Sequence, residues 1–108
     1  MTKKQQNKLI LQFLTDHYRN WHLLEVPDYN ANINLLLIAV DRIQSHGFCT
    51  ELNFIFGLGH RFYVTSAGTG VYKARVFKSR EAAIFDGVVK FIIWFKRNSC
   101  VQAKISNQ

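Results

Sequence analysis

The chain has 108 residues, enough for one domain with its own hydrophobic core. Hydrophobic residues make up 48% and aromatic residues 14%, which excludes an intrinsically disordered chain. The formal net charge is +7 and the isoelectric point about 9.7, so the surface favours acidic partners: a nucleic acid, an acidic protein face or an anionic membrane surface. The alternative is that the charge serves solubility alone.

Cysteine usage and the chain ends bear on location. Cys49 and Cys100 form no C-x-x-C motif, which favours two reduced thiols in a cytoplasmic protein, with a disulfide as the alternative. The amino end is polar and lacks a small-residue cleavage site, so we expect no signal peptide. The longest apolar run, 91–95, is too short to span a bilayer. We expect a soluble protein in the cytoplasm, with no membrane partner.

The first 26 residues predict an amphipathic helix and a linker. Apolar residues recur at helical spacing between Lys3 and Leu24, at Leu9, Ile10, Phe13, Leu14, Tyr18 and Trp21. Lysines at the amino end oppose the helix dipole, so we expect a frayed, flexible first turn containing Lys3, Lys4 and Lys8. Pro27 ends this element because it pushes Val26 out of the α region.

A second helix is expected from Pro27 onward. Asp28 or Asn30 can cap it, and it runs to about Ser45, where Gly47 supplies a left-handed stop. Its predicted buried stripe is Ile33, Leu36, Leu37, Val40 and Ile43.

Three strands follow in the pattern. The first, Phe48–Phe56, alternates and places one set of side chains on a shared face: Phe48, Leu52, Phe54 and Phe56. The turn 57–59 leads to His60–Ser66, whose Phe62 and Val64 face the core. A second glycine-rich turn, 67–70, precedes Val71–Phe77. In this third strand the inward residues are Tyr72, Ala74 and Val76.

Ser79 is a good N-cap for a final helix with Glu81 in its first turn. Its apolar stripe is wider than one sheet face can cover, at Ile84, Phe85, Val88, Val89, Phe91, Ile92, Ile93, Trp94 and Phe95. This helix is therefore buried on two sides or forms a homodimer contact, and a strand over 88–95 is the alternative. Residues 98–108 are expected to be a loose polar tail.

The predicted fold class is α+β. Residues 27–97 form an αβββα unit in which two helices pack on one face of a three-stranded antiparallel sheet. The extra amino-terminal helix is free to cover the other face.

The order from Pro27 to Phe95 resembles the phage ABA sandwich domain family. The resemblance rests on Pro-Asp-Tyr-Asn-Ala-Asn-Ile at 27–33, Ser-His-Gly-Phe at 45–48, Phe-Tyr-Val-Thr at 62–65 and Ser-Arg-Glu-Ala-Ala-Ile at 79–84. It covers about two thirds of the chain and implies a viral accessory role, including action against host defence. The family brings no catalytic residues to carry over. This chain departs from it by its basic charge and by the aromatic pattern of its first helix.

The αβββα order also resembles the double-stranded-RNA-binding domain. In that domain a glycine-rich hairpin ending in His and a basic helix start contact the minor groove and phosphates. Gly57-Leu58-Gly59-His60 and Lys78-Ser79-Arg80-Glu81-Ala82 match these features. The hairpin proline is missing, and only Lys78 and Arg80 represent the usual lysine cluster.

No catalytic constellation, metal site or cofactor is predicted. The four histidines stand on separate elements without ligand spacing, at His17, His22, His46 and His60. No acidic residues pair in the pattern, and Gly47 and Phe48 turn the chain between His46 and Cys49. Each of the pairs Gly57/Gly59 and Gly68/Gly70 leads into a strand, so hairpin turns explain them better than phosphate loops. We expect a protein that is not an enzyme.

A basic set of side chains is the candidate binding site. Alternation places Lys73 and Arg75 outward on the third strand, and Lys78 and Arg80 continue toward the last helix. Arg61 and Tyr63 are expected on the outer face of the neighbouring strand. Together these six suit a phosphate-tracking surface with one stacking ring. The alternative is that the first helix covers this face and leaves only Lys78 and Arg80 outside.

Three functions are carried forward. The first is an accessory protein without enzymatic activity that binds and blocks a host macromolecule inside a bacterium. The second is a nucleic-acid-binding module, for which duplex RNA is the favoured ligand. The third is a small-ligand sponge, with a nucleotide held in a dimer groove.

Overall fold

The fold is α+β, as predicted, with three helices and an antiparallel sheet. The computed structural model describes residues 1–15 and 24–106, and the side chains of 1–15 and 24–98. Among these residues, no helix has the length and apolar character that crossing a membrane requires. The helices are α1 (Lys3–Leu14), a 3-10 turn η2 (Tyr29–Ala31), α2 (Ile33–Ser45) and α3 (Arg80–Ser106), and the strands are β1 (Cys49–Ile55), β2 (Gly59–Ser66), β3 (Thr69–Gly70) and β4 (Val76–Phe77).

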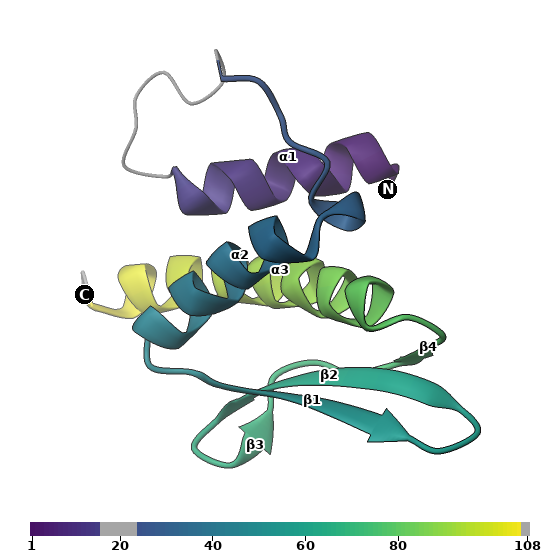
Figure 1. Cartoon of the computed structure of the whole chain (residues 1–108). Coiled ribbons are helices and arrows are strands. Elements are labelled where there is room, and N and C mark those ends of the chain that lie inside the picture. The colour runs from purple at the N-terminus through teal and green to yellow at the C-terminus, as the bar shows by residue number, and fades with distance from the viewer. Residues whose placement is uncertain (16–23, 107–108) are drawn as a thin grey trace.

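The elements stack in three layers, with α1 on one side, α2 and α3 in the middle and the sheet on the other side (Figure 1). The alternative in which the first helix covers the outer sheet face is therefore excluded. Instead α1 buries Ile10, Leu11 and Phe13 against the other helices, and the Phe13 ring meets Phe91 edge-on at 6.0 Å. The outer face of the sheet has no helix over it.

The first turn of α1 is capped rather than frayed. The Thr2 side chain accepts from the Gln5 backbone N–H at 3.1 Å, and the Gln5 side chain accepts from the Thr2 N–H at 2.8 Å. This capping box satisfies two amide groups that would otherwise lack partners. Lys3 is further fixed because its Nζ lies 4.7 Å from the centre of the Phe85 ring. The predicted continuation through Tyr18, Trp21 and His22 lies outside the described residues.

The cap of α2 is Asn32, rather than the predicted Asp28 or Asn30. Its side chain accepts from the backbone N–H groups of Asn34 and Leu35 at 3.0 and 3.3 Å. Asp28 precedes η2 and makes no capping hydrogen bond, and Asn30 accepts from the Asn7 side chain at 2.8 Å. The buried stripe of α2 is Leu36, Ala39, Val40 and Ile43, so Leu37, predicted inside, is exposed. Gly47 ends the region with a φ of +91°, as predicted.

The sheet is built around β2. β1 pairs with it antiparallel over the whole strand, from Cys49 opposite Thr65 to Ile55 opposite Gly59. The predicted third strand is interrupted, because only β3 and β4 pair with β2 and residues 71–75 leave the sheet between them. In this region Phe77 packs against the core, whereas Val76, predicted inside, is exposed.

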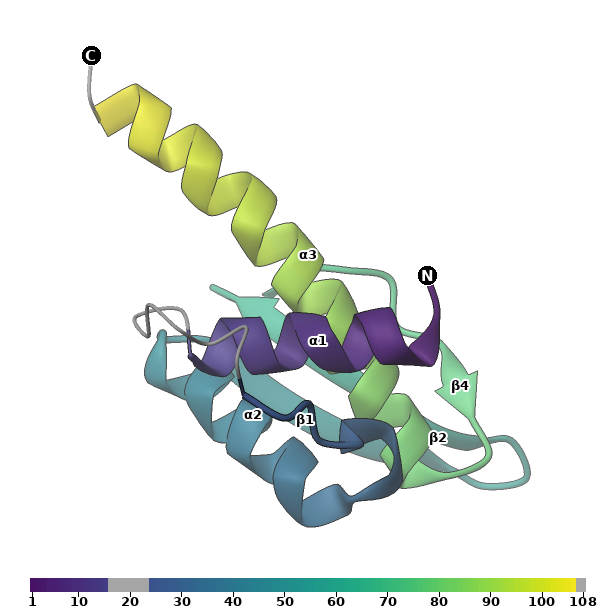
Figure 2. The ribbon, with the colours of Figure 1, turned by 90° about the horizontal axis from the view of Figure 1, so that it is seen from above.

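The predicted helical reading of 88–95 is confirmed, since α3 runs without interruption to Ser106 and passes the predicted end near residue 97 (Figure 2). Ser79 is its cap, as predicted, and accepts from the Ala82 N–H at 3.1 Å. Phe91 and Ile92 are fully buried because α3 lies between the sheet and α1, with α2 beside it. Burial on two sides accounts for the wide apolar stripe, so this stripe does not require a second copy.

Candidate functional site

Of the four most exposed large apolar side chains among the described residues, three lie on the β1–β2 hairpin and the fourth is Met1, at 69% exposure. Phe54, Phe56 and Leu58 are 65%, 93% and 67% exposed, and Leu52 is also exposed. We call Leu52, Phe54, Phe56 and Leu58 the hairpin surface. Isolated exposed apolar residues are ordinary, whereas several on one hairpin indicate a contact surface for a partner.

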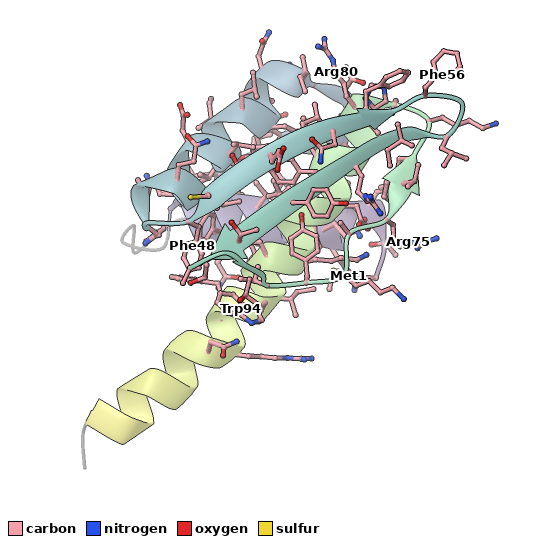
Figure 3. The ribbon with its side chains drawn as sticks, turned by 90° about the horizontal axis from the view of Figure 1, so that it is seen from below. Met1, Phe48, Phe56, Arg75, Arg80 and Trp94 are labelled. Carbon is pink, nitrogen blue, oxygen red and sulfur yellow. The ribbon has the colours of Figure 1, made fainter. Side chains whose placement is uncertain are left out.

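The local sequence explains why the hairpin projects these side chains. Gly57 and Gly59 adopt φ values of +80° and +131°, which residues with a side chain rarely reach, and the Leu58 N–H donates to the Ile55 carbonyl at 2.9 Å. The turn therefore closes tightly and points Phe56 and Leu58 outward. Phe54 and Phe56, which the sequence pattern placed on one face with Phe48 and Leu52, are both exposed at this end of the sheet. Figure 3 shows Phe56 at the tip of the hairpin.

A cationic rim borders the hairpin surface. A side-chain carbon on Gly59 would collide with the Phe77 carbonyl oxygen and come within 3.4 Å of the Lys78 Cα, so the chain after β4 passes directly beside the turn. Figure 3 shows Arg80 and Phe56 at the same end of the molecule. Lys78 and Arg80 are both exposed. The hairpin therefore combines apolar side chains with adjacent positive charge.

Arg80 forms an ion pair with its neighbour in the sequence, Glu81. Its Nε donates to the Glu81 carboxylate at 3.3 Å. The pKa of Glu81 is lowered, first because its carboxylate accepts from its own backbone N–H and then because it accepts from Arg80. His60 contributes weakly to the same shift, and its ring lies 5.1 Å from the Phe54 ring. The start of α3 therefore carries the Arg80–Glu81 ion pair.

The six predicted site residues do not form one surface. Arg61 and Tyr63 alternate with buried Phe62 and therefore lie on the outer sheet face, as predicted, with the Arg61 guanidinium carbon 5.0 Å from the Tyr63 ring centre. Arg61 Nε is buried and has no hydrogen-bond partner among the described residues. Glu51 stands opposite Tyr63 and adds a negative charge to this face. The outer face is therefore mixed in charge rather than basic.

Lys73 and Arg75, the other two predicted cations, lie in a third region of the molecule. Lys73 lies in the stretch 71–75 that leaves the sheet, and Arg75 stacks over Phe77 at 5.8 Å from its ring centre. Figure 3 shows Arg75 beside β4, on the opposite side of the hairpin from Arg80. Only Lys78 and Arg80 reach the hairpin surface.

The histidine and cysteine side chains that the structure describes do not gather at one place. The ring of His46 lies against Phe95 and Phe13, with centroids 5.0 and 5.8 Å away. Cys49 is an exposed free thiol at the start of β1. Within 1–15 and 24–98, no three His, Cys, Asp or Glu side chains come close enough to hold a metal ion. Predicted positions His17 and His22 lie outside the described residues.

Comparison with known proteins adds no relative: no family model, no curated protein and no solved structure matches this chain.

Proposed function

We propose that this protein is a binding protein without enzymatic activity that occupies a functional surface of an acidic protein partner. The observation that carries the proposal is the hairpin surface, whose Phe56 is 93% exposed beside Lys78 and Arg80. Aromatic side chains supply most of the energy of protein contacts, and a cationic rim selects acidic partners and speeds association. A blocking role in a bacterial cell, which the phage family resemblance implies, is part of this proposal.

The test compares capture by three forms of the chain. Immobilised wild type, the paired change Phe56→Ser and Leu58→Ser, and the control Ile38→Ser are exposed to the same bacterial lysate. Ile38 is an apolar α2 residue of similar exposure, distant from the hairpin in the sequence. We expect a defined partner that wild type and Ile38→Ser retain and the paired change loses. Equal retention by all three forms contradicts the proposal.

Nucleic-acid binding is the second candidate, favoured by one observation. The outer sheet face lacks the helix that would have covered it, and the Arg61–Tyr63 stack lies on that face. A base can stack on such a ring while the arginine meets a phosphate. The hairpin tip argues for the protein partner instead, because Phe56 and Leu58 offer a phosphate backbone no hydrogen bond.

A salt series separates the two candidates. Phosphate contacts release counterions, so binding to labelled duplex RNA, duplex DNA or single strands must weaken steeply with salt, by roughly 0.7 to 0.9 of a log–log slope unit per contact. Arg61→Ser should then reduce the slope, and Lys78→Glu with Arg80→Glu should abolish a duplex contact at the start of α3. Absence of binding at low salt removes this candidate.

A further inference from the structure

The outer edge of β1 is unpaired and unprotected. β1 pairs with β2 on one side and, within the described part of the chain, with no strand on the other. Soluble proteins usually guard such an edge with lysine, proline or a bulge. The seven residues Cys49–Ile55 contain no lysine or proline and only one charge, at Glu51. Such an edge is suited to pairing with another strand.

The backbone groups available at this edge follow from the hairpin closure. The Ile55 carbonyl accepts from the Leu58 N–H, so the polar groups of Ile55 face β2. In an antiparallel pair the backbone groups alternate between the partner and the other side. Those of Phe54 and Leu52 therefore point outward and are free to form a ladder with an incoming strand.

Side chains at the same edge are arranged to cover such a strand. Leu52 and Phe54 stand opposite Phe62 and His60, so they lie on the helix-facing side of the sheet, yet they are 40% and 65% exposed. Within the described part of the chain, no element covers these two side chains fully. A strand added to β1 would bring its own alternate side chains into contact with both.

Helix α2 supplies the other wall. Gln44 Nε2 donates to Thr50 Oγ1 at 2.7 Å, which fixes the flank of α2 that faces β1. Leu37, seven residues earlier, lies on the same flank and is 48% exposed. It stands about 10 Å along the helix from Gln44, level with the stretch between Leu52 and Phe54. Figure 1 shows α2 in the helix layer next to the sheet, and Figure 3 shows it extending past the outer side of β1.

We propose that β1 accepts an extended segment of the acidic partner as an added strand between its free edge and α2. Apolar side chains at alternate positions of that segment contact Leu37, Leu52 and Phe54, and its backbone pairs with β1. Carboxylates at one end meet Arg80, which Figure 3 shows at the hairpin end of the molecule, with Lys78 beside the turn at Gly59. This inference rests on the proposed function and specifies its mode of binding.

A displayed library of random ten-residue peptides, selected on the full chain, tests the inference. We expect enriched peptides with apolar residues at every second position and acidic residues toward one end. Leu52→Pro removes an outward N–H without disturbing the pairing with β2, and it should weaken the best peptide at least tenfold. Because a proline can also perturb folding, the pair Leu52→Lys and Phe54→Lys provides a second block. Ile38→Lys is the matched control and should bind normally.

The possible results distinguish strand addition at β1 from the proposed binding function on which it rests. Tenfold losses in both blocked forms, with slowed hydrogen exchange at the Leu52 and Phe54 amides of the complex, support strand addition. Peptides lost with Phe56→Ser and Leu58→Ser but retained by Leu52→Pro overturn strand addition and leave the binding function standing. Failure to enrich any peptide, or a self-associating chain whose dimer Leu52→Pro dissolves, overturns the inference, while lysate capture decides the function separately.

Discussion

Tyr72 crosses the sheet edge at the one place where α3 has no side chain, over Gly87. The Tyr72 hydroxyl donates to the Phe62 carbonyl at 2.6 Å, and a carbon added to Gly87 would collide with that hydroxyl and with the Phe62 ring. A glycine inside a helix is unfavourable by about 1 kcal/mol relative to alanine. Here it gives the tyrosine room to tie the irregular stretch 71–75 to β2.

Gly87→Ala should therefore destabilise the protein despite its better helix propensity. Overpacking a filled core costs about 1–3 kcal/mol and exceeds the propensity gain, so we expect the free energy of unfolding to fall by at least about 1 kcal/mol. Chemical denaturation measures it. The same change in a Tyr72→Phe background should cost less, because the colliding hydroxyl is gone. A stabilised Gly87→Ala protein would contradict this account of the site.

Stability should also decline at high pH because of Tyr72. Burial, and then the nearby charge of Asp86, raises the pKa of Tyr72 well above its ordinary value of about 10. The unfolded chain loses this proton near pH 10 while the folded protein keeps it, so the free energy of unfolding decreases as pH rises above about 10. Burial raises the pKa of Tyr29 in the same direction. Tyr72→Phe should show a shallower decline in denaturation series from pH 8 to 11, and an unchanged slope would refute the assignment.

Local patterns in the sequence predicted the elements well, and contacts between distant elements decided what remained. Helical periodicity located α2 and α3. The glycines at 47, 57 and 59 marked the end of α2 and the β1–β2 turn, because these signals act within a few residues. In the interrupted third strand, Tyr72 lies against Gly87, fifteen positions away in the sequence. No local pattern carries that information.

The candidate site shows the same division. Alternation put Leu52 and Phe54 on one face, and the pairing with β2 makes this the helix-facing side of the sheet. Their exposure could not be predicted, because the sequence does not show how far α2 extends over β1. The basic residues were recognised individually, whereas their separation onto three regions follows from the break at 71–75. In the sequence, the available signal for the hairpin surface was the set of apolar residues at alternate positions from Leu52 to Leu58, which continues through the glycine turn.

The cap of α2 offers a direct comparison between two neighbouring candidates. Asn32 accepts two backbone N–H groups, whereas Asp28 caps nothing. Asn32→Ala should lower the free energy of unfolding by about 1 kcal/mol, and Asp28→Ala should change it by less than about 0.5 kcal/mol. Thermal or chemical denaturation of both variants at one pH provides the measurement. The reverse ranking would restore the boundary expected from the sequence.

Substitutions of Phe91 and Phe56 should have very different effects on stability, because one side chain is buried and the other is exposed. Phe91 is fully buried and meets Phe13, Phe48 and Phe95, so Phe91→Ala should cost about 3–5 kcal/mol. Phe56 is almost fully exposed, and Phe56→Ser should leave the free energy of unfolding within about 0.5 kcal/mol of wild type. An aromatic side chain kept in water without a stabilising role is expected to serve a partner. A large loss of stability in Phe56→Ser, measured by denaturation, would assign the hairpin tip to folding instead.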